Sequence, residues 1–196
     1  MKLLFVDCCI SQRGAASRTK ALAAAFLETF RQSHSGARIE TADLAALALK
    51  LFTVDMLDRR GALAAAGRWD APIFDLARQF RGADAVAVAA PFWDLSFPAA
   101  LRVYVEHISA NGLTYHYEAD GCHGDCAARR LVYLTAGGGF EREDSLGVLY
   151  WRQLAAMFGI PCFDYVFAGG LDVAGMEAGK LLDGACRLAR QLAAED

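Results

Sequence analysis

Three stretches of this sequence carry residues suited to holding a small ligand. The first, Cys8 to Thr19, places hydroxyl groups and arginines directly before a segment of helical period. Oriented backbone N–H groups and the dipole at a helix N-terminus favour an anion. A phosphate group bound by Ser17 and Arg18 is one interpretation, and a simple N-cap role for Ser17 is the alternative.

The second stretch runs from Pro91 to Phe97 and holds three aromatic rings, at Phe92, Trp93 and Phe97. Aromatic side chains stack on flat heteroaromatic ligands, which favours a ring-shaped cofactor at this loop. Since apolar aromatics are more often core residues than ligand contacts, anchoring of the loop onto the core is the alternative.

The third stretch reads Thr135-Ala136-Gly137-Gly138-Gly139. Glycine has no Cβ and tolerates positive φ, so the backbone here can approach a ligand closely and offer its N–H groups to ring carbonyls. A glycine-rich turn alone does not indicate a ligand site, but three such stretches that converge in one place do.

Several function classes are excluded by what the sequence lacks. Neither the Gly-x-Gly-x-x-Gly fingerprint of dinucleotide-binding Rossmann domains nor the Gly-x-x-x-x-Gly-Lys-Ser/Thr of P-loop NTPases occurs. The 20 basic and 23 acidic residues give a net charge of −3, which argues against nucleic acid or an anionic membrane surface as partner. We also expect no transmembrane segment, since each apolar run falls short of about 20 residues.

Apolar runs that alternate with helical periodicity predict an α/β protein with a parallel sheet covered on both faces. We expect one domain over residues 1–196, with a weakly patterned stretch at 44–68. The predicted strands are Lys2–Asp7, Arg38–Asp43, Ala85–Ala90, Arg130–Thr135 and Cys162–Phe167. The predicted helices lie at about 17–33, 70–80, from Ser96 or Phe97 past Ile108, 146–158 and 181–192.

A flavodoxin-like three-layer fold with strand order 2-1-3-4-5 is the topology that this pattern favours. In open α/β sheets the ligand binds beyond the carboxyl ends of the strands, where the strand order reverses. The three stretches follow Asp7, Ala90 and Thr135, each at the end of a predicted strand. They are therefore expected to meet in one crevice between the first and third strands.

At these residues the sequence resembles the FMN-dependent NAD(P)H oxidoreductases of the flavodoxin-like superfamily, the group of quinone reductases and azoreductases. The resemblance extends over nearly the whole chain, and its pieces are residues 17–19, 90–98, 112–117 and 135–139. It implies bound FMN as cofactor and NADH or NADPH as co-substrate. It also implies three groups of cofactor contacts, which are Cys9, Ser11, Ser17, Arg18 and Thr19 for the phosphate, Pro91, Phe92, Trp93, Asp94 and Leu95 around the isoalloxazine, and Thr135, Ala136, Gly137 and Gly138 at its pyrimidine edge.

Three positions depart from the family pattern. Cys9 stands where a serine is usual, with Ser11 as a nearby substitute, and Asp94 stands where asparagine is frequent. An ionised Asp94 beside the ring would disfavour an anionic reduced flavin by charge repulsion. Residues 136–139 lack the arginine that azoreductases often carry, which places this chain closer to general quinone or nitroaromatic reductases.

The activity implied is hydride transfer from NAD(P)H through the flavin to a quinone or a related nitro or azo aromatic. Because both substrates would use one open flavin face, ping-pong kinetics are expected. The resemblance also implies a homodimer, with the aromatic excursion from Tyr115 to Cys126 as a lid and His116 as an optional proton donor. An electron-carrier flavodoxin and a flavin-free scaffold domain on the same fold are the alternatives.

Six cysteines without an export signal indicate reduced thiols and a cytoplasmic protein. Cys8 and Cys9 at a strand end are expected to be packed, apolar thiols. The segment Cys122-His123-Gly124-Asp125-Cys126 resembles a metal or redox motif, but a structural zinc site needs four ligands and no second cysteine pair of matching spacing exists. We therefore expect no metal, with a Cys122–Cys126 redox pair as the alternative.

Overall fold

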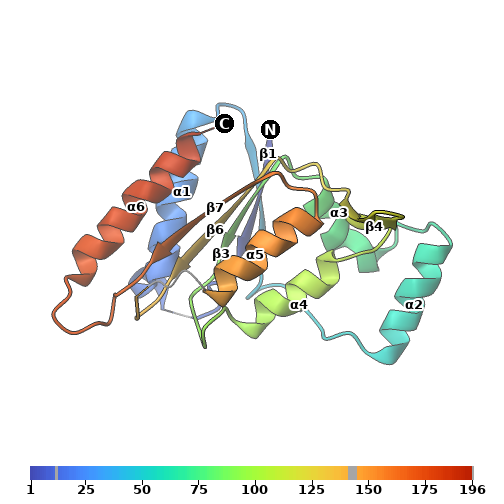
Figure 1. Ribbon diagram of the computed structural model, residues 1–196, viewed down its shortest axis with the longest axis horizontal. Coiled ribbons are helices and arrows are strands. Elements are labelled where there is room, and N and C mark those ends of the chain that lie inside the picture. The colour runs from blue at the N-terminus through green and yellow to red at the C-terminus, as the bar shows by residue number, and fades with distance from the viewer. Residues whose placement is uncertain (12, 141–144, 196) are drawn as a thin grey trace.

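The strands of the central sheet are apolar runs that are buried on both faces, as expected of parallel strands between helices. The computed structural model describes residues 1–11, 13–140 and 145–195. Within them, a five-stranded parallel sheet has the order β2-β1-β3-β6-β7 (Figure 1). The strands are β1 Lys2–Asp7, β2 Arg38–Asp43, β3 Ala85–Ala89, β6 Arg130–Ala136 and β7 Cys162–Ala168. Counted within this sheet the order is 2-1-3-4-5, so the predicted flavodoxin-like topology is confirmed.

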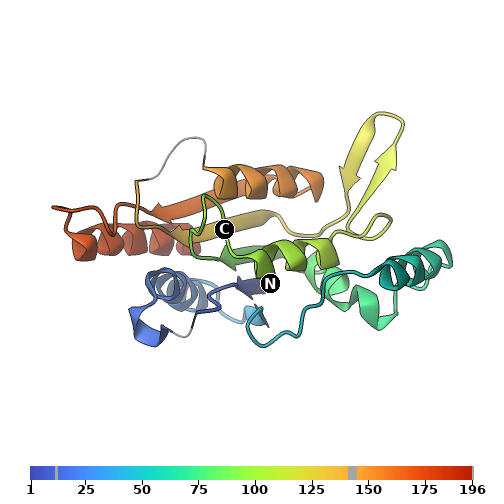
Figure 2. The ribbon, with the colours of Figure 1, turned by 90° about the horizontal axis from the view of Figure 1, so that it is seen from below.

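Alternate side chains of each strand enter two separate cores. On one face, Leu4, Val86 and Leu131 pack beneath α3, α4 and α5. On the other face, Leu3 and Val132 pack beneath α1 and α6. The helices that form these layers are α1 Arg18–Ser33, α3 Asp75–Arg81, α4 Ala99–Ile108, α5 Leu146–Met157 and α6 Ala178–Ala194 (Figures 1 and 2).

The helix boundaries show where local chemistry outweighs apolar periodicity. α4 begins at Ala99, not at Ser96 or Phe97, because Pro98 is extended at ψ 146° and the residue before a proline avoids helical geometry. The helix expected at 70–80 starts as a 3₁₀ turn, Pro72–Phe74, before α3. Among the described residues, no helix is both long enough and apolar enough to cross a membrane.

The weakly patterned stretch contains α2, Val54–Ala65, which has no buried residue. Arg60 attaches α2 to the rest of the molecule. Its guanidinium donates to the carbonyl of Ser109 at 2.8 Å, just beyond the end of α4. The same guanidinium lies 5.0 Å from the ring centre of Phe52. α2 therefore lies at the surface, with Leu63 and Ala64 packed, partly buried, against the cluster around Phe74.

The excursion after α4 forms a two-stranded antiparallel hairpin, β4 Tyr115–Glu118 and β5 Gly121–Gly124, which was not expected as strands. It projects from the body of the molecule beside α5 (Figure 2). Gly124 contacts the backbone of Phe158 and Gly159, the turn that precedes β7. The hairpin therefore lies near the amino ends of the strands.

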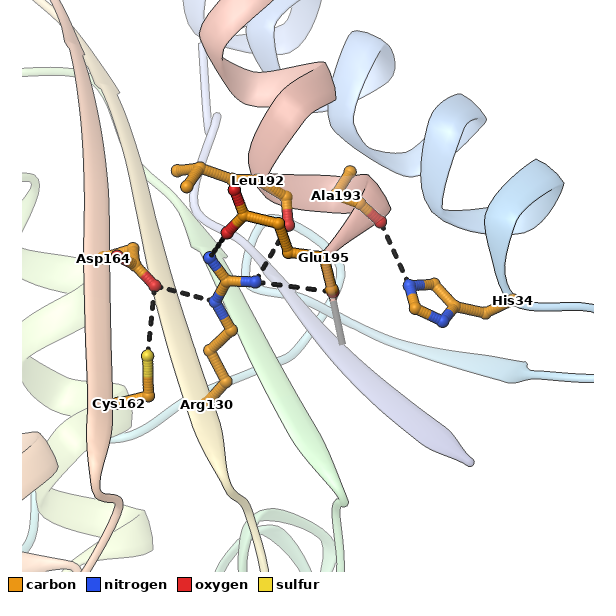
Figure 3. A network of polar contacts seen from close by, with 7 residues as sticks. All are labelled: His34, Arg130, Cys162, Asp164, Leu192, Ala193 and Glu195. Carbon is orange, nitrogen blue, oxygen red and sulfur yellow. Dashed lines mark hydrogen bonds and ion pairs between the residues drawn. The ribbon is translucent and has the colours of Figure 1, made fainter.

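A largely buried arginine, Arg130, joins the amino edge of the sheet to the C-terminal end of α6 (Figure 3). Arg130 at the start of β6 pairs with Asp164 of β7 at 2.7 Å and with Glu195 at 2.7 Å. It also donates to the carbonyl of Leu192 at 3.1 Å. The side chain of Arg130 is only 13% exposed, so this network is screened less than a surface pair would be.

Substitution of Gly124 by alanine tests how the hairpin is attached. A Cβ at this position would overlap the backbone of Phe158 and Gly159, so the hairpin or the turn must shift. We expect the free energy of unfolding, measured by urea denaturation, to fall by about 1–3 kcal/mol, the usual cost of overpacking.

The matched control is Gly61→Ala in α2, where an added Cβ meets nothing within 4 Å. We expect this variant to gain stability by about 1 kcal/mol, because alanine is the better helix former. Equal stability of the Gly124→Ala and wild-type proteins would contradict the tight docking of the hairpin.

Candidate functional site

The N-terminus of α1 opens onto the carboxyl edge of the sheet. A 3₁₀ turn, Gly14–Ala16, leads into Ser17, which is extended and caps α1 by accepting a hydrogen bond from the backbone N–H of Lys20 at 3.3 Å. The first turn of a helix leaves further N–H groups without an intrahelical acceptor. This end of α1 therefore combines a hydroxyl, free amides and the positive end of the helix dipole.

A polar cavity of about 210 Å³ lies at this helix end and joins the three predicted stretches. Ser11, Ser17, Arg18 and Thr19 line it from the first stretch, and Pro91, Phe92 and Trp93 from the second. Ala136, Gly137 and Gly138 complete it from the third. The expected convergence between β1 and β3 thus holds for most of the predicted site residues.

The loop after β3 is shaped by a tight turn at residues 93–96. Trp93 and Ser96 exchange two backbone hydrogen bonds, of 2.8 and 3.3 Å, around Asp94 and Leu95. Asp94 has φ 50° and Leu95 has φ 65°, a pair of positive values typical of a type I′ turn. Such a conformation is unusual for leucine, and strained residues of this kind cluster at functional sites.

Backbone hydrogen bonds tie these loops to one another. The N–H of Phe92 donates to the carbonyl of Ala136 at 3.0 Å, and the N–H of Asp172 donates to the carbonyl of Gly138 at 3.0 Å. A Cβ at Gly137 would lie 3.1 Å from the Phe92 ring, and one at Gly138 would overlap the carboxylate of Asp172. A side chain at either position would therefore displace a neighbouring side chain, the Phe92 ring at Gly137 or the Asp172 carboxylate at Gly138.

A second hollow, of about 410 Å³, adjoins the polar cavity and shares Phe92 with it. Its lining is mainly apolar, with Leu95, Phe140, Leu146 and Phe167 among the contributing residues. The Phe92 and Phe167 rings pack with their centres 5.0 Å apart. The two hollows together offer a polar end and an apolar end to one elongated ligand.

Asp172 is a site residue that the sequence argument missed. Its carboxylate accepts a hydrogen bond from the Arg18 guanidinium at 2.6 Å, and both side chains line the polar cavity. This hydrogen bond lowers the pKa of Asp172 and raises that of Arg18. The position of Asp172 in the sequence provided a signal, because it lies shortly after β7, at the same carboxyl edge of the sheet as the other site loops. Arg13 also lines the cavity and follows β1 in the same way.

Four predicted contacts lie outside the polar cavity. Thr135 is fully buried inside β6, which continues to Ala136 and not only to Thr135. Cys9 is buried beside α1, Leu95 lines the apolar hollow, and Asp94 is exposed at the tip of the turn. Thr135 and Cys9 are therefore buried residues beneath the site loops and not part of the cavity lining.

Cys8 and Cys9 are packed thiols, as expected. Both are buried, and burial together with the charge of Asp7 raises the pKa of the Cys8 thiol to about 12 and that of Cys9 further. The backbone N–H of Cys9 donates to the Asp7 carboxylate at 2.8 Å. Neither thiol is placed to act as a nucleophile at neutral pH.

The hairpin does not cover the cavity of its own chain, contrary to the expectation that it closes over the ligand as a lid. It docks by Gly124 near the amino end of β7, whereas the cavity lies at the carboxyl ends of the strands. His116 binds Asp125 and Glu118 within the hairpin region and does not line either hollow. Only a second copy of the chain could bring these residues to the site.

The residues present fit a ligand with a phosphate monoester and a flat ring system. Ser11, Ser17 and Thr19 supply hydroxyl donors at a helix N-terminus, which is the donor set that phosphate prefers. The aromatic and glycine residues of the other two loops form an adjoining wall on which a ring can stack. FMN has both of these parts.

Comparison with known proteins agrees with this geometry. The model of a protein family described as having a flavodoxin-like fold matches residues 1–192. An FMN-dependent NADH:quinone oxidoreductase 2 from Clostridium acetobutylicum is 30% identical over 199 residues, covering 99% of this chain and 98% of that protein.

Solved structures of azoreductases are also similar. An azoreductase from Bacillus anthracis (Sterne) superposes with a TM-score of 0.86 at 25% identity, covering 99% of each chain. An FMN-dependent NADH-azoreductase from the Ames Ancestor strain, solved in complex with FMN, has a TM-score of 0.85 at 19% identity, covering 98% of this chain and 97% of that one. The family match over residues 1–192, together with the sheet order and the site at its carboxyl edge, shows that this chain belongs to the flavodoxin-like fold family.

Proposed function

We propose that this protein is an FMN-dependent oxidoreductase that transfers hydride from NADH or NADPH to a quinone or a related nitro or azo aromatic. The observation that carries the proposal is the polar cavity at the α1 N-terminus, which adjoins an apolar hollow at the strand-order reversal. The names of the relatives, FMN-dependent NADH:quinone oxidoreductase and azoreductase, support the same chemistry.

The phosphate would be held at the N-terminus of α1. Ser17 and Thr19 are both nearly buried there, with 8% and 3% of their surface exposed, so hydrogen bonds to them compete little with water. Ser11 adds a third hydroxyl to the lining. Arg13 and Arg18 are the cations of the lining, and the Arg18 guanidinium is already paired with Asp172.

The ring system would lie against the loop of residues 91–97 and the glycines of residues 137–139. Trp93, just before the turn at Asp94 and Leu95, is exposed to solvent. Leu95 of the same turn lines the apolar hollow. Backbone N–H groups in the glycine loop would donate to ring carbonyls without obstruction by a side chain. Asp94, if ionised, would oppose negative charge on the reduced ring.

FMN, when bound, supplies the hydride and electron chemistry, while the chain supplies binding, orientation and polarity. The apolar hollow beside Phe92, Phe140 and Phe167 offers an apolar surface that fits a flat aromatic acceptor. Because this one hollow must receive both the nicotinamide and the acceptor, we propose that they bind in turn, with ping-pong kinetics.

We further propose a homodimer in the cytoplasm. Leu95, Phe140 and Leu146 are all more than half exposed around the apolar hollow, an apolar surface that a second subunit could cover. All six cysteines are free thiols, which suits a reducing compartment. Gel filtration with light scattering tests the dimer directly.

The first experiment is the absorbance spectrum of the purified protein after FMN addition and desalting. We expect flavin to be retained, to bleach under anaerobic NADH or NADPH, and to recover its colour when menadione is added. Double-reciprocal plots of the initial rate against NADH concentration, measured at several menadione concentrations, would be parallel for the ping-pong order.

Two outcomes contradict the proposal in different ways. Loss of the flavin on desalting, with no measurable FMN affinity, would leave the cavity without its ligand and favour a scaffold domain. Retained flavin that neither NADH nor NADPH reduces would favour an electron carrier.

Substitution of Ser17 by alanine tests the phosphate site. We expect the Kd for FMN to rise about tenfold, equivalent to about 1.4 kcal/mol, because one buried hydrogen bond to a charged group is lost. Riboflavin lacks the phosphate, so its Kd is expected to stay unchanged. An equal effect on FMN and riboflavin would place the phosphate elsewhere.

Thr53→Ala is the matched control for the lost helix cap. Thr53 caps α2 as Ser17 caps α1, by accepting from the N–H of Met56 at 3.3 Å. Both variants are expected to lose about 1 kcal/mol of stability, but only Ser17→Ala should weaken FMN binding.

Substitution of Asp172 by asparagine tests the charge balance of the cavity. It removes a carboxylate from the lining and frees Arg18 to face an anion. We expect FMN to bind about fivefold more tightly, because the repulsion between the carboxylate and the phosphate is removed, and riboflavin to bind as before. Asp183→Asn on the exposed surface of α6 is the control for net charge, and equal behaviour of the two variants would contradict this role of Asp172.

A further inference from the structure

One face of the β4–β5 hairpin gathers two imidazoles and three carboxylates. The antiparallel register places His116 directly opposite His123, and the two rings stack with centres 5.6 Å apart. Glu118 lies two residues beyond His116 in the same strand and therefore on the same face. Asp120 in the turn and Asp125 after β5 complete the group.

The side-chain atoms that could bind a cation point toward one another. His123 Nε2 lies 2.7 Å from Asp120 Oδ1, and His116 Nε2 lies 3.1 Å from Glu118 Oε1. Single ligand atoms of Glu118, Asp120 and His123 all lie within 4.8 Å of one another. This spacing leaves room for one ion that contacts several of them at once.

Asp125 orients His116 for this role. Its carboxylate accepts a hydrogen bond from His116 Nδ1 at 2.8 Å, which holds the other ring nitrogen, Nε2, toward Glu118. A carboxylate on the far nitrogen of a ligating histidine is the usual outer partner at metal sites.

We propose that His116, Glu118, Asp120 and His123 bind a divalent transition-metal cation of the zinc class, with Asp125 as the orienting partner of His116. Two imidazoles with carboxylates form a borderline ligand set that suits Zn²⁺ and its neighbours, whereas Mg²⁺ and Ca²⁺ prefer oxygen ligands alone. Bound at this place, the ion would cross-link both strands and the turn of the hairpin.

The cysteines of the same segment are not ligands in this arrangement. Cys122 pairs with Tyr117 in the register and therefore lies on the opposite face from His116 and His123. The Cys126 thiol is half buried and donates to the carbonyl of Thr114 at 3.5 Å. The site is thus a different one from the Cys122–Cys126 motif that the sequence suggests.

The test uses untagged, flavin-loaded protein, since a histidine tag would itself bind the metal. Titration with Zn²⁺ is followed by calorimetry, and titration with Co²⁺ by visible absorbance, whose intensity reports the coordination geometry. We expect one ion per chain, Co²⁺ bands of a four- or five-coordinate site, and no binding of Mg²⁺ under the same conditions.

Single variants assign the ligands. We expect His123→Asn and Glu118→Gln each to weaken Zn²⁺ binding by about tenfold or more, and Asp125→Asn to weaken it by a smaller factor within the range known for outer partners. His107→Asn is the matched control, because His107 lies in α4, away from the hairpin, with its Nε2 near the carbonyl of Lys50. Circular dichroism of each variant confirms that the fold is retained.

Three results would overturn the proposal. The first is the absence of stoichiometric Zn²⁺ and Co²⁺ binding. The second is equal weakening by His107→Asn and His123→Asn, and the third is loss of binding in Cys122→Ser with retention in His123→Asn. Because binding is read without enzymatic turnover, failure here is distinguishable from failure of the proposed flavin chemistry.

Discussion

The reversal of winding between β1 and β3 is the constraint on which the rest of this structure depends. After β1 the chain crosses to β2 on one side, and after β3 it crosses to β6 on the other. Crossovers between parallel strands are right-handed, so α1 and α4 must cover opposite faces of the sheet. The loops that leave β1 and β3 therefore diverge at the carboxyl edge, and a cavity opens between them.

Packing makes this edge both open and well defined. The large buried side chains Tyr104, Tyr133 and Trp151 fill the face beneath α4 and α5, while Ala87 and Ala89 of β3 leave space for α1 on the other face. The Arg130 network holds the amino edge together with the end of α6. At the opposite, carboxyl edge, backbone hydrogen bonds join the loops to one another, from Phe92 to Ala136 and from Asp172 to Gly138.

Polarity changes along the site in the direction that an elongated cofactor requires. The helix N-terminus, the hydroxyls and the Arg18–Asp172 pair form one end, and the phenylalanines around the adjoining hollow form the other. The strained turn at Asp94 and Leu95 lies where the two ends meet. Positive φ at a leucine persists only where surrounding contacts determine it, which here are the two hydrogen bonds between Trp93 and Ser96.

Local sequence patterns determined the five strands of the central sheet to within one residue, the existence of the covering helices and the three loops of the site. Buried parallel strands need continuous apolar runs, and the ends of those runs at Asp7, Ala90 and Thr135 were legible without knowledge of the fold. The start of α4 was misplaced because proline suits the first turn of a helix, whereas Pro98 is extended and immediately precedes the helix.

Only the tertiary structure decided what depends on contacts between distant residues. The bounds of α2 within the weakly patterned stretch came from the structure, and Asp172 joins the site through a hydrogen bond to Arg18, 154 residues away in the sequence. The hairpin is the clearest case. Its spacing drew attention to Cys122 and Cys126, whereas the cross-strand register turns Cys122 away and brings His116 to His123, since pairing between strands sets which side chains share a face.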